Sequence, residues 1–129
     1  MKFWKIVLSL FIAGIIATTL PSCTLAKYKK KARLIQVSNV DLATIKNGAY
    51  EGYYDIYKVD AHVLVEMENG KIRNIRLINH KCVDGYSGEK IVDTVLKEQS
   101  LHVDAITGAT NSCMTILKAI EVALLKGLK

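Results

Sequence analysis

The sequence contains few cysteines, and none is spaced as metal ligands usually are. Cys23, Cys82 and Cys113 form no Cys-x-x-Cys pair, and no histidine lies at helical spacing from another ligand. We therefore expect no metal site. If Cys23 is lipidated or removed, Cys82 and Cys113 are able to pair as a disulfide in an oxidising compartment.

The chain also lacks acidic residues before Asp41. Seven of its 18 Lys and Arg residues precede residue 34, so the formal net charge of +6 belongs to the N-terminal segment. From residue 34 onward, 11 Lys and Arg stand against 12 Asp and Glu. This near-neutral part has no basic excess of the kind that nucleic-acid binding needs, and we expect no nucleic-acid partner.

The first 26 residues are typical of a signal or anchor segment. Residues 6–20 carry no charge, but they are fewer than the roughly 20 apolar residues that a spanning helix needs. A basic start, an apolar middle and small residues at the exit are also the plan of a signal peptide. We favour an uncleaved anchor. The alternatives are a lipoprotein, because residues 20–23 resemble a lipobox ending at Cys23, and plain cleavage after residues 24–26.

Residues 27–46 are predicted to be a basic juxtamembrane connector. The cations of residues 27–33 are expected to contact anionic lipid headgroups, at about 1 kcal/mol for each cation. Cations beside a spanning helix tend to stay cytoplasmic, whereas the signal-like start indicates export. We follow the start and predict a membrane-associated domain on the extracytoplasmic face of a bacterial cytoplasmic membrane.

Residues 47–129 are predicted to form one domain, which begins with strands. A helical turn at 41–46 precedes them, and residues 50–57, 61–68 and 71–79 are expected to be strands. Asn69-Gly70 is typical of a two-residue hairpin turn. That turn predicts three cross-strand pairs: Glu68 with Lys71, Glu66 with Arg73, and Met67 with Ile72.

Two helices are expected after the strands. Ser87 is a candidate cap for a helix over residues 88–99. The second helix is expected to begin near 108–110, because apolar residues recur there at helical spacing: Cys113, Met114, Leu117, Ile120, Leu124 and Leu128. The predicted fold class is α+β, an antiparallel sheet with two covering helices.

A turn of small residues opens the second helix. Gly108 and Ala109 leave the backbone accessible, and Thr107, Thr110 and Ser112 add hydroxyl groups. Unpaired N–H groups and the positive end of the helix dipole favour a phosphate at such a place. Ser and Thr at a helix start are more often simple caps, so these residues alone leave both interpretations open.

The same stretch resembles the flavinylation motif of the FMN-binding domain family, known from the sodium-pumping NADH:quinone oxidoreductase and the Rnf complex. That motif reads Asp-x-x-Ser/Thr-Gly-Ala-Thr. Its fixed places are filled by Asp104, Thr107, Gly108, Ala109 and Thr110. The resemblance implies FMN as the cofactor, joined to Thr110 by a phosphoester bond, and adds Asn111 and Ser112 to the cofactor-binding residues.

The resemblance extends over about residues 47–127 and has one clear departure. The family often has His-x-Glu after the third strand, but His80-Lys81-Cys82 places a cysteine where the acid is expected. As partners, the resemblance implies redox proteins and an external flavin transferase, which takes FMN from FAD with a magnesium ion. It assigns Asp104 to transferase recognition or metal handling; an Asx turn is the alternative.

The sequence therefore predicts an electron-transfer module in which the protein supplies tether and orientation. No general base or nucleophile triad is visible, so we do not expect an enzyme by itself. Four strand tyrosines are candidates to stack on the flavin, with ordinary packing as the alternative: Tyr50, Tyr53, Tyr54 and Tyr57. Two other functions stay open, a module that binds FMN or another phosphate ligand without covalent attachment, and a redox-sensing lipoprotein that uses Cys82 and Cys113.

Overall fold

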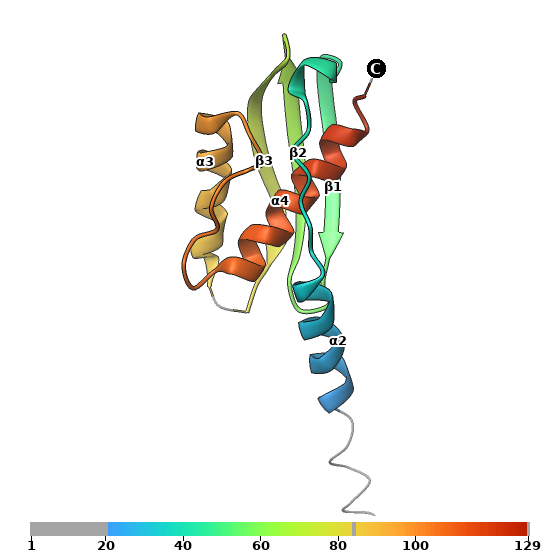
Figure 1. Ribbon diagram of the computed structural model, residues 1–129, viewed down its shortest axis with the longest axis vertical. Helices are drawn as coiled ribbons and strands as arrows, with labels where there is room; N and C mark the ends of the chain where they lie inside the picture. Colours follow the sequence, from blue (N-terminus) through green and yellow to red (C-terminus); the bar gives the residue numbers. More distant parts are fainter. Residues whose placement is uncertain (1–20, 84, 129) are drawn as a thin grey trace, which may run out of the picture.

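A computed structural model describes residues 21–83 and 85–128 (Figure 1). The apolar run predicted at residues 6–20 lies outside them. The elements, in chain order, are α2 (Pro21–Arg33), η1 (Leu42–Thr44), β1 (Gly48–Asp55), β2 (Asp60–Glu68), β3 (Lys71–Lys81), η2 (Tyr86–Lys90), α3 (Ile91–Glu98) and α4 (Thr110–Leu125). Among the described residues, none of the helices combines the length and the apolar character that crossing a bilayer requires.

The three strands form one antiparallel sheet in the order β1-β2-β3. Buried and half-buried residues alternate along β2, with Ala61, Val63, Val65 and Met67 on the buried face. This period of two buries one face of the sheet against the helices, as alternation in the sequence predicts. The α+β class and the antiparallel sheet are confirmed.

The hairpin turn between β2 and β3 also forms as predicted. Asn69 and Gly70 have φ values of +53° and +71°, the positive values that a two-residue turn of this kind needs. Glu68 pairs with Lys71 and Met67 with Ile72. The prediction for Glu66 is wrong, because it pairs with Asn74 across a register shift. The extra residue, Arg73, donates a hydrogen bond to Glu68 instead.

A second register shift lies near the end of β3. His62 of β2 pairs with Asn79, but the next residue, Val63, pairs with Leu77, so Ile78 is an extra residue in the ladder. Such a bulge reverses the faces of the residues that follow it. As a result His80, opposite Ala61, is turned to the buried face.

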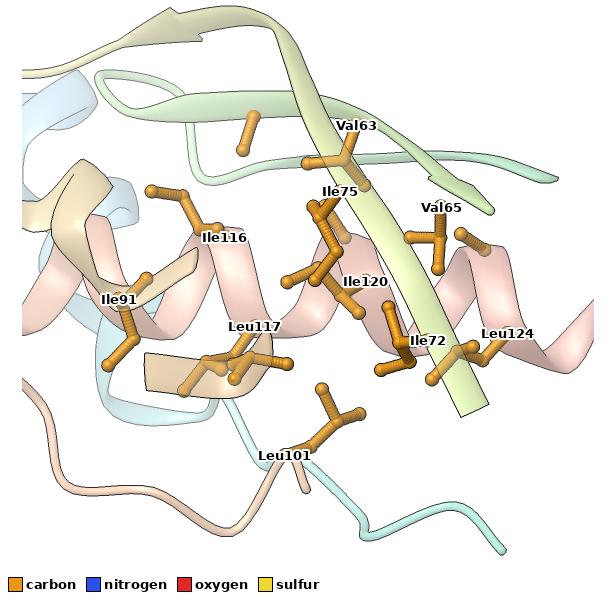
Figure 2. Close-up of a cluster of buried hydrophobic side chains, with 14 of the residues drawn as sticks. Val63, Val65, Ile72, Ile75, Ile91, Leu101, Ile116, Leu117, Ile120 and Leu124 are labelled. Carbon is orange, nitrogen blue, oxygen red and sulfur yellow. The ribbon is translucent and has the colours of Figure 1, made fainter. Parts of the chain in front are cut away.

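Helix α4 lies against β1 and β2, and α3 lies beside β3 (Figure 1). Their apolar side chains meet those of the sheet in the main core, in which Ile116, Ile120 and Leu124 of α4 face Val63 and Val65 (Figure 2). The helix comes unusually close at Gly52. A Cβ atom there would lie 1.9 Å from the Ala119 carbonyl oxygen and 2.7 Å from the Ala123 nitrogen. Only glycine permits this approach.

The region before α4 differs from the prediction in detail. A helix capped by Ser87 was expected over residues 88–99, but Ser87 lies within the 3-10 helix η2, and α3 begins only at Ile91 without a side-chain cap. Gln99, at φ +53°, ends α3. Its side chain accepts from the Ile72 N–H at 2.8 Å and donates to the Ile72 carbonyl at 2.9 Å. This tie to the edge strand β3 explains the end of the helix.

Helix α2 crosses the boundary predicted at residues 26 and 27. Among the α2 side chains that the structure describes, only Tyr28 is buried. It packs with Ile35, Ile56 and Val59 in a small cluster next to the β1–β2 connection. Part of the predicted connector is therefore helical and packed on the domain. The helical turn expected at 41–46 is confirmed as η1, where the Asp41 carboxylate accepts from the Ala43 N–H at 3.0 Å.

Gly52→Ala should destabilise the protein, because the added methyl group overlaps the backbone of α4. Overpacking of this kind costs about 1–3 kcal/mol of unfolding free energy. Urea denaturation followed by circular dichroism measures the change. The control is Ala49→Ser on the exposed face of the same strand, with a change within about 0.5 kcal/mol. Equal stability of wild type and Gly52→Ala would contradict the close approach.

Candidate functional site

A tight turn leads into the first residue of α4. The Ala109 N–H donates to the Ile106 carbonyl at 3.0 Å, which closes a four-residue turn. Gly108, third in that turn, has φ +83°, a value that this position requires in a type II turn. Thr110 follows as the first residue of the helix. The sequence prediction of a helix start near 108–110 is confirmed.

The N-terminus of α4 has no side-chain cap. The N-cap residue is Ala109, and no side-chain hydrogen bond caps the helix. Ser, Thr, Asp and Asn normally fill this position, because their side chains accept from the unpaired N–H groups. An alanine leaves those groups available to an anion from outside, together with the positive end of the helix dipole.

The predicted cofactor-binding residues divide into a surface group and an inner group. Asp104, Thr107, Gly108 and Thr110 are exposed. Ala109 and Ser112 are buried, and Asn111 is half-buried. The Thr110 hydroxyl is thus presented at the surface, over small side chains that pack inward.

Two elements distant in sequence hold this helix start. The Asn111 side chain donates to the Tyr28 hydroxyl of α2 at 2.8 Å. On the other side lies Gly88 of η2, where a Cβ atom would stand 2.7 Å from that of Ser112. Neither Tyr28 nor Gly88 was predicted to belong to the site. The residues next to Tyr28 and Gly88 in the sequence do not indicate a role at the site, because both residues contact it from distant segments of the chain.

Cys113 links the turn to η2. Its sulfur accepts from the Ile106 N–H at 3.4 Å and lies 3.7 Å from the Gly88 carbonyl oxygen, to which the thiol donates. Burial raises the pKa of the Cys113 thiol above its ordinary value, although the hydrogen bond from Ile106 acts in the opposite direction. All three cysteines lie within the described residues and none is bonded to another, so the disulfide that the sequence allows is not formed.

A hollow of about 260 Å³ lies between α2 and Asn111, the second residue of α4. Its lining includes two cations of α2, and the residues are Tyr28, Lys29, Ala32, Arg33 and Asn111. A phosphate or another anionic group near the helix start would therefore meet positive charge from α2 as well as backbone N–H groups.

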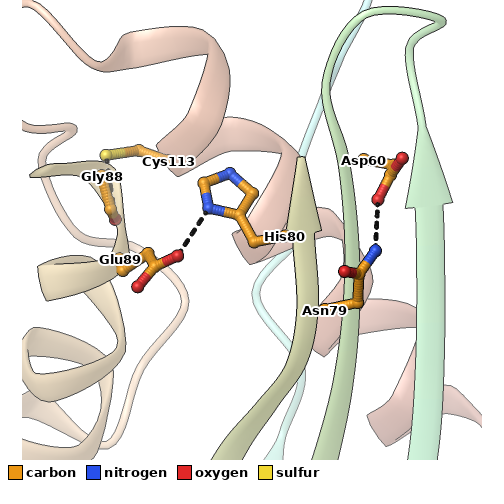
Figure 3. A network of polar contacts seen from close by, with 6 residues as sticks. All are labelled: Asp60, Asn79, His80, Gly88, Glu89 and Cys113. Carbon is orange, nitrogen blue, oxygen red and sulfur yellow. Dashed lines mark hydrogen bonds and ion pairs between the residues drawn. The ribbon is translucent and has the colours of Figure 1, made fainter. Parts of the chain in front are cut away.

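His80 and Glu89 form a pair close to the same helix start (Figure 3). His80 Nδ1 lies 3.0 Å from a Glu89 carboxylate oxygen, and the His80 side chain is only 1% exposed. The other ring nitrogen, Nε2, is buried and has no hydrogen-bond partner among the described residues. A buried polar atom without a partner costs about 1–3 kcal/mol. The carboxylate beside His80 belongs to Glu89 of η2. The His-x-Glu pattern would instead place an acid two residues after the histidine in the sequence.

The four tyrosines predicted to lie on the first strand have separate surroundings, and for Tyr57 the strand prediction is wrong, because β1 ends at Asp55 and Tyr57 has φ +72° in the connection that follows. Tyr50 is at the wrong end of α4: its hydroxyl donates to the Lys46 carbonyl, and its ring lies against Gly127, about 24 Å along the helix from Thr110. Tyr53 is exposed and contacts His62. The Lys31 ammonium lies over the rings of Tyr54 and Tyr57, 5.4 and 5.2 Å from their centres.

Within the described part of the chain, no cluster of three or more metal-ligating side chains is present.

The sequence pattern of the FMN-binding domain family matches residues 57–125 of this chain, more than half of its length. The chain belongs to the FMN-binding domain family. It therefore binds FMN, and the motif around Thr110 lies inside the matched region.

A curated relative shows a more distant similarity. NADH:acrylate oxidoreductase of Vibrio harveyi is 29% identical over 102 residues, which cover 77% of this chain and 10% of the relative. The chain thus spans about a tenth of the length of that protein. No solved structure matches the chain.

The residues around the start of α4 suit FMN. The helix end is uncapped, the Thr110 hydroxyl is exposed, and the adjoining hollow carries Lys29 and Arg33. These groups would hold the phosphate, which is the part of FMN with formal charge. His80 Nε2, buried and without a partner among the described residues, is a further polar atom, linked to the site through Glu89 and its neighbour Gly88.

The two domain cysteines should differ sharply in reactivity. Cys113 is buried and its raised pKa keeps the thiol protonated, while Cys82 is partly exposed. Because the thiolate is the nucleophile, iodoacetamide at neutral pH should modify Cys82 in the native protein and Cys113 only after unfolding. Peptide mass spectrometry locates the label, and Cys82→Ser should remove it. If both thiols react only after addition of a reductant, a disulfide exists and the unbonded arrangement is wrong.

Proposed function

We propose that the chain is a membrane-associated electron-transfer module that carries FMN as a phosphoester on Thr110. The observation that carries the proposal is the exposed Thr110 hydroxyl at an uncapped helix N-terminus, inside the region that matches the FMN-binding family. The motif places each small residue where the turn needs it, including Gly108 at positive φ.

The attachment step is a phosphoryl substitution at Thr110. The Thr110 oxygen forms a bond to the FMN phosphorus of FAD, the phosphoanhydride bond of FAD breaks, and AMP leaves. The hydroxyl proton passes to a base of the transferase or to water. The diester that results keeps one negative charge, which the N–H groups of the first turn of α4 stabilise. Asp104 is exposed in the loop before the turn, where a transferase and its magnesium ion have access to it.

When bound, FMN supplies the capacity to accept and pass on one or two electrons. The residues of the chain hold and orient it. The relative named NADH:acrylate oxidoreductase is an electron-transferring protein by name, which supports an electron-transfer role here. A tether makes sense for a carrier outside the cytoplasm, where released FMN would be lost by diffusion.

Membrane association rests on the N-terminal sequence and on α2. Residues 1–26 are proposed as an anchor, with lipidation of Cys23 or cleavage as the alternative fates. Lys27, Lys29, Lys30 and Arg33 are exposed on α2. The helix is tied to the domain by Tyr28, so a bilayer on the extracytoplasmic side would lie near the end of the sheet where Thr110 is presented.

Thr110→Ala should abolish covalent flavin, because it removes the only oxygen nucleophile at the first position of α4. The protein is co-expressed with a flavin transferase, and intact-mass spectrometry measures the adduct, which is FMN minus water. Thr110→Ser keeps a hydroxyl and should be modified. Thr44→Ala, the matched control at an exposed threonine of η1, should also retain the adduct.

An unmodified mass in wild-type protein, despite a transferase active on another substrate, would refute the covalent attachment. Flavin that co-purifies but separates from the chain on denaturation would instead support the second candidate, a module that holds FMN without a covalent bond. The family match favours both candidates equally, and the exposed threonine at the helix start favours the first.

A further inference from the structure

His80 is placed on the buried face by the β-bulge at Ile78. Without that extra residue, the alternation through Ile75 and Leu77 would bury Asn79 and turn His80 to solvent. The buried imidazole is then fixed by Glu89, whose carboxylate lies 3.0 Å from Nδ1. The β-bulge at Ile78 and the 3-10 helix η2 thus together fix the position of the His80 side chain.

The second ring nitrogen of His80 is available for a ligand. Nε2 has no partner among the described residues, although buried polar side-chain atoms nearly always have one. The Cys113 thiol nearby is already engaged with Gly88 and Ile106. Against the imidazole lies the ring of Tyr86, edge to face with 6.2 Å between centres, and this tyrosine is 66% exposed. One neighbour of the imidazole is therefore a side chain at the surface.

The position of His80 relative to Thr110 follows from a short chain of contacts. Gly88 lies directly against Ala109, the N-cap residue of α4, and Ser112, the third residue of that helix. The next residue, Glu89, holds His80. In Figure 3, Nε2 is on the side of the ring turned away from Glu89, toward the helix that carries Cys113.

We propose that His80 Nε2 makes a hydrogen bond to FMN bound at the start of α4, and that Glu89 is the positioning residue that orients the imidazole for it. The inference rests on the proposed flavin site at Thr110. An imidazole nitrogen either donates or accepts, and FMN offers both kinds of group. The bond gives the orphaned nitrogen its partner and ties the flavin to β3 as well as to α4.

The first test observes Nε2 directly. Full-length protein with ¹⁵N-labelled histidine is compared before and after loading with FMN, either by co-expression with a transferase or, if intact mass shows no covalent flavin, by saturating FMN. His80→Asn identifies the signal. We expect the Nε2 chemical shift to change on loading. An unchanged shift, as expected if Nε2 meets only water, overturns the proposal. The mass reports separately on covalent attachment, so failure of one claim is distinguishable from failure of the other.

The second test uses two substitutions of His80, each of which keeps a polar atom at the position of one of the two ring nitrogens. His80→Gln reaches the Nε2 position, whereas His80→Asn reaches only the Nδ1 position beside Glu89. The visible absorption spectrum and the reduction potential of the loaded protein should stay close to wild type in His80→Gln and shift in His80→Asn. Glu89→Gln should give a smaller shift of the same sign, because it acts through the orientation of the ring.

Loaded His80→Asn with the spectrum and potential of wild type would overturn the proposal, as would equal shifts in both variants, which indicate a structural role alone. A chain that takes up no FMN by either route overturns the proposal and the flavin site together. If His80→Asn fails to fold, His80→Gln identifies the signal, and the shift comparison on wild-type protein still decides the matter.

Discussion

The close approach of α4 to β1 determines where the rest of the domain lies. At Gly52 the helix backbone comes so near the strand that a single methyl group would overlap it. The helix residues facing that point are alanines, Ala119 and Ala123, which keep the contact short. The first turn of α4 lies against η2 and α2. Gly88 and Tyr28 meet it there and hold Thr110 at the surface.

Local features of the fold could be predicted from the sequence because neighbouring residues determine them. Asn69-Gly70 has the φ values of its turn whatever surrounds it, and Gly108 serves the turn before α4 in the same way. The alternation along β2 and the helical spacing of Leu117, Ile120 and Leu124 define the core. The motif at Thr110 was recognisable for the same reason: the family match covers it, and its fixed residues are neighbours in sequence, with Asp104 in the loop and the others in the turn and at the helix start.

What could not be predicted depends on contacts between distant segments. The bulges at Arg73 and Ile78 lie in strands whose residue types would equally suit an unbroken ladder, so the Glu66 pairing was wrong and the burial of His80 was not foreseen. Helix α2 is polar on most sides, and contacts with distant segments show that it belongs to the domain: Tyr28 packs on the β1–β2 connection and accepts a hydrogen bond from Asn111. The sequence predicted that Cys113 lies on the apolar face of its helix, and it is buried in the core, but the hydrogen bonds by which its sulfur joins the turn to η2 were not foreseen.

The buried residues that follow Thr110 also constrain how this threonine can be modified. Cys113 and Ile116, within two turns of it, are fully buried, so drawing Thr110 into an extended peptide groove would require unpacking the core. Any enzyme that acts on Thr110 therefore has to recognise a folded surface, made by the turn, η2 and α2 together. In this respect the motif would be recognised by its folded conformation and not only by its sequence. The same seven residues in an unstructured tail would not present an equivalent substrate.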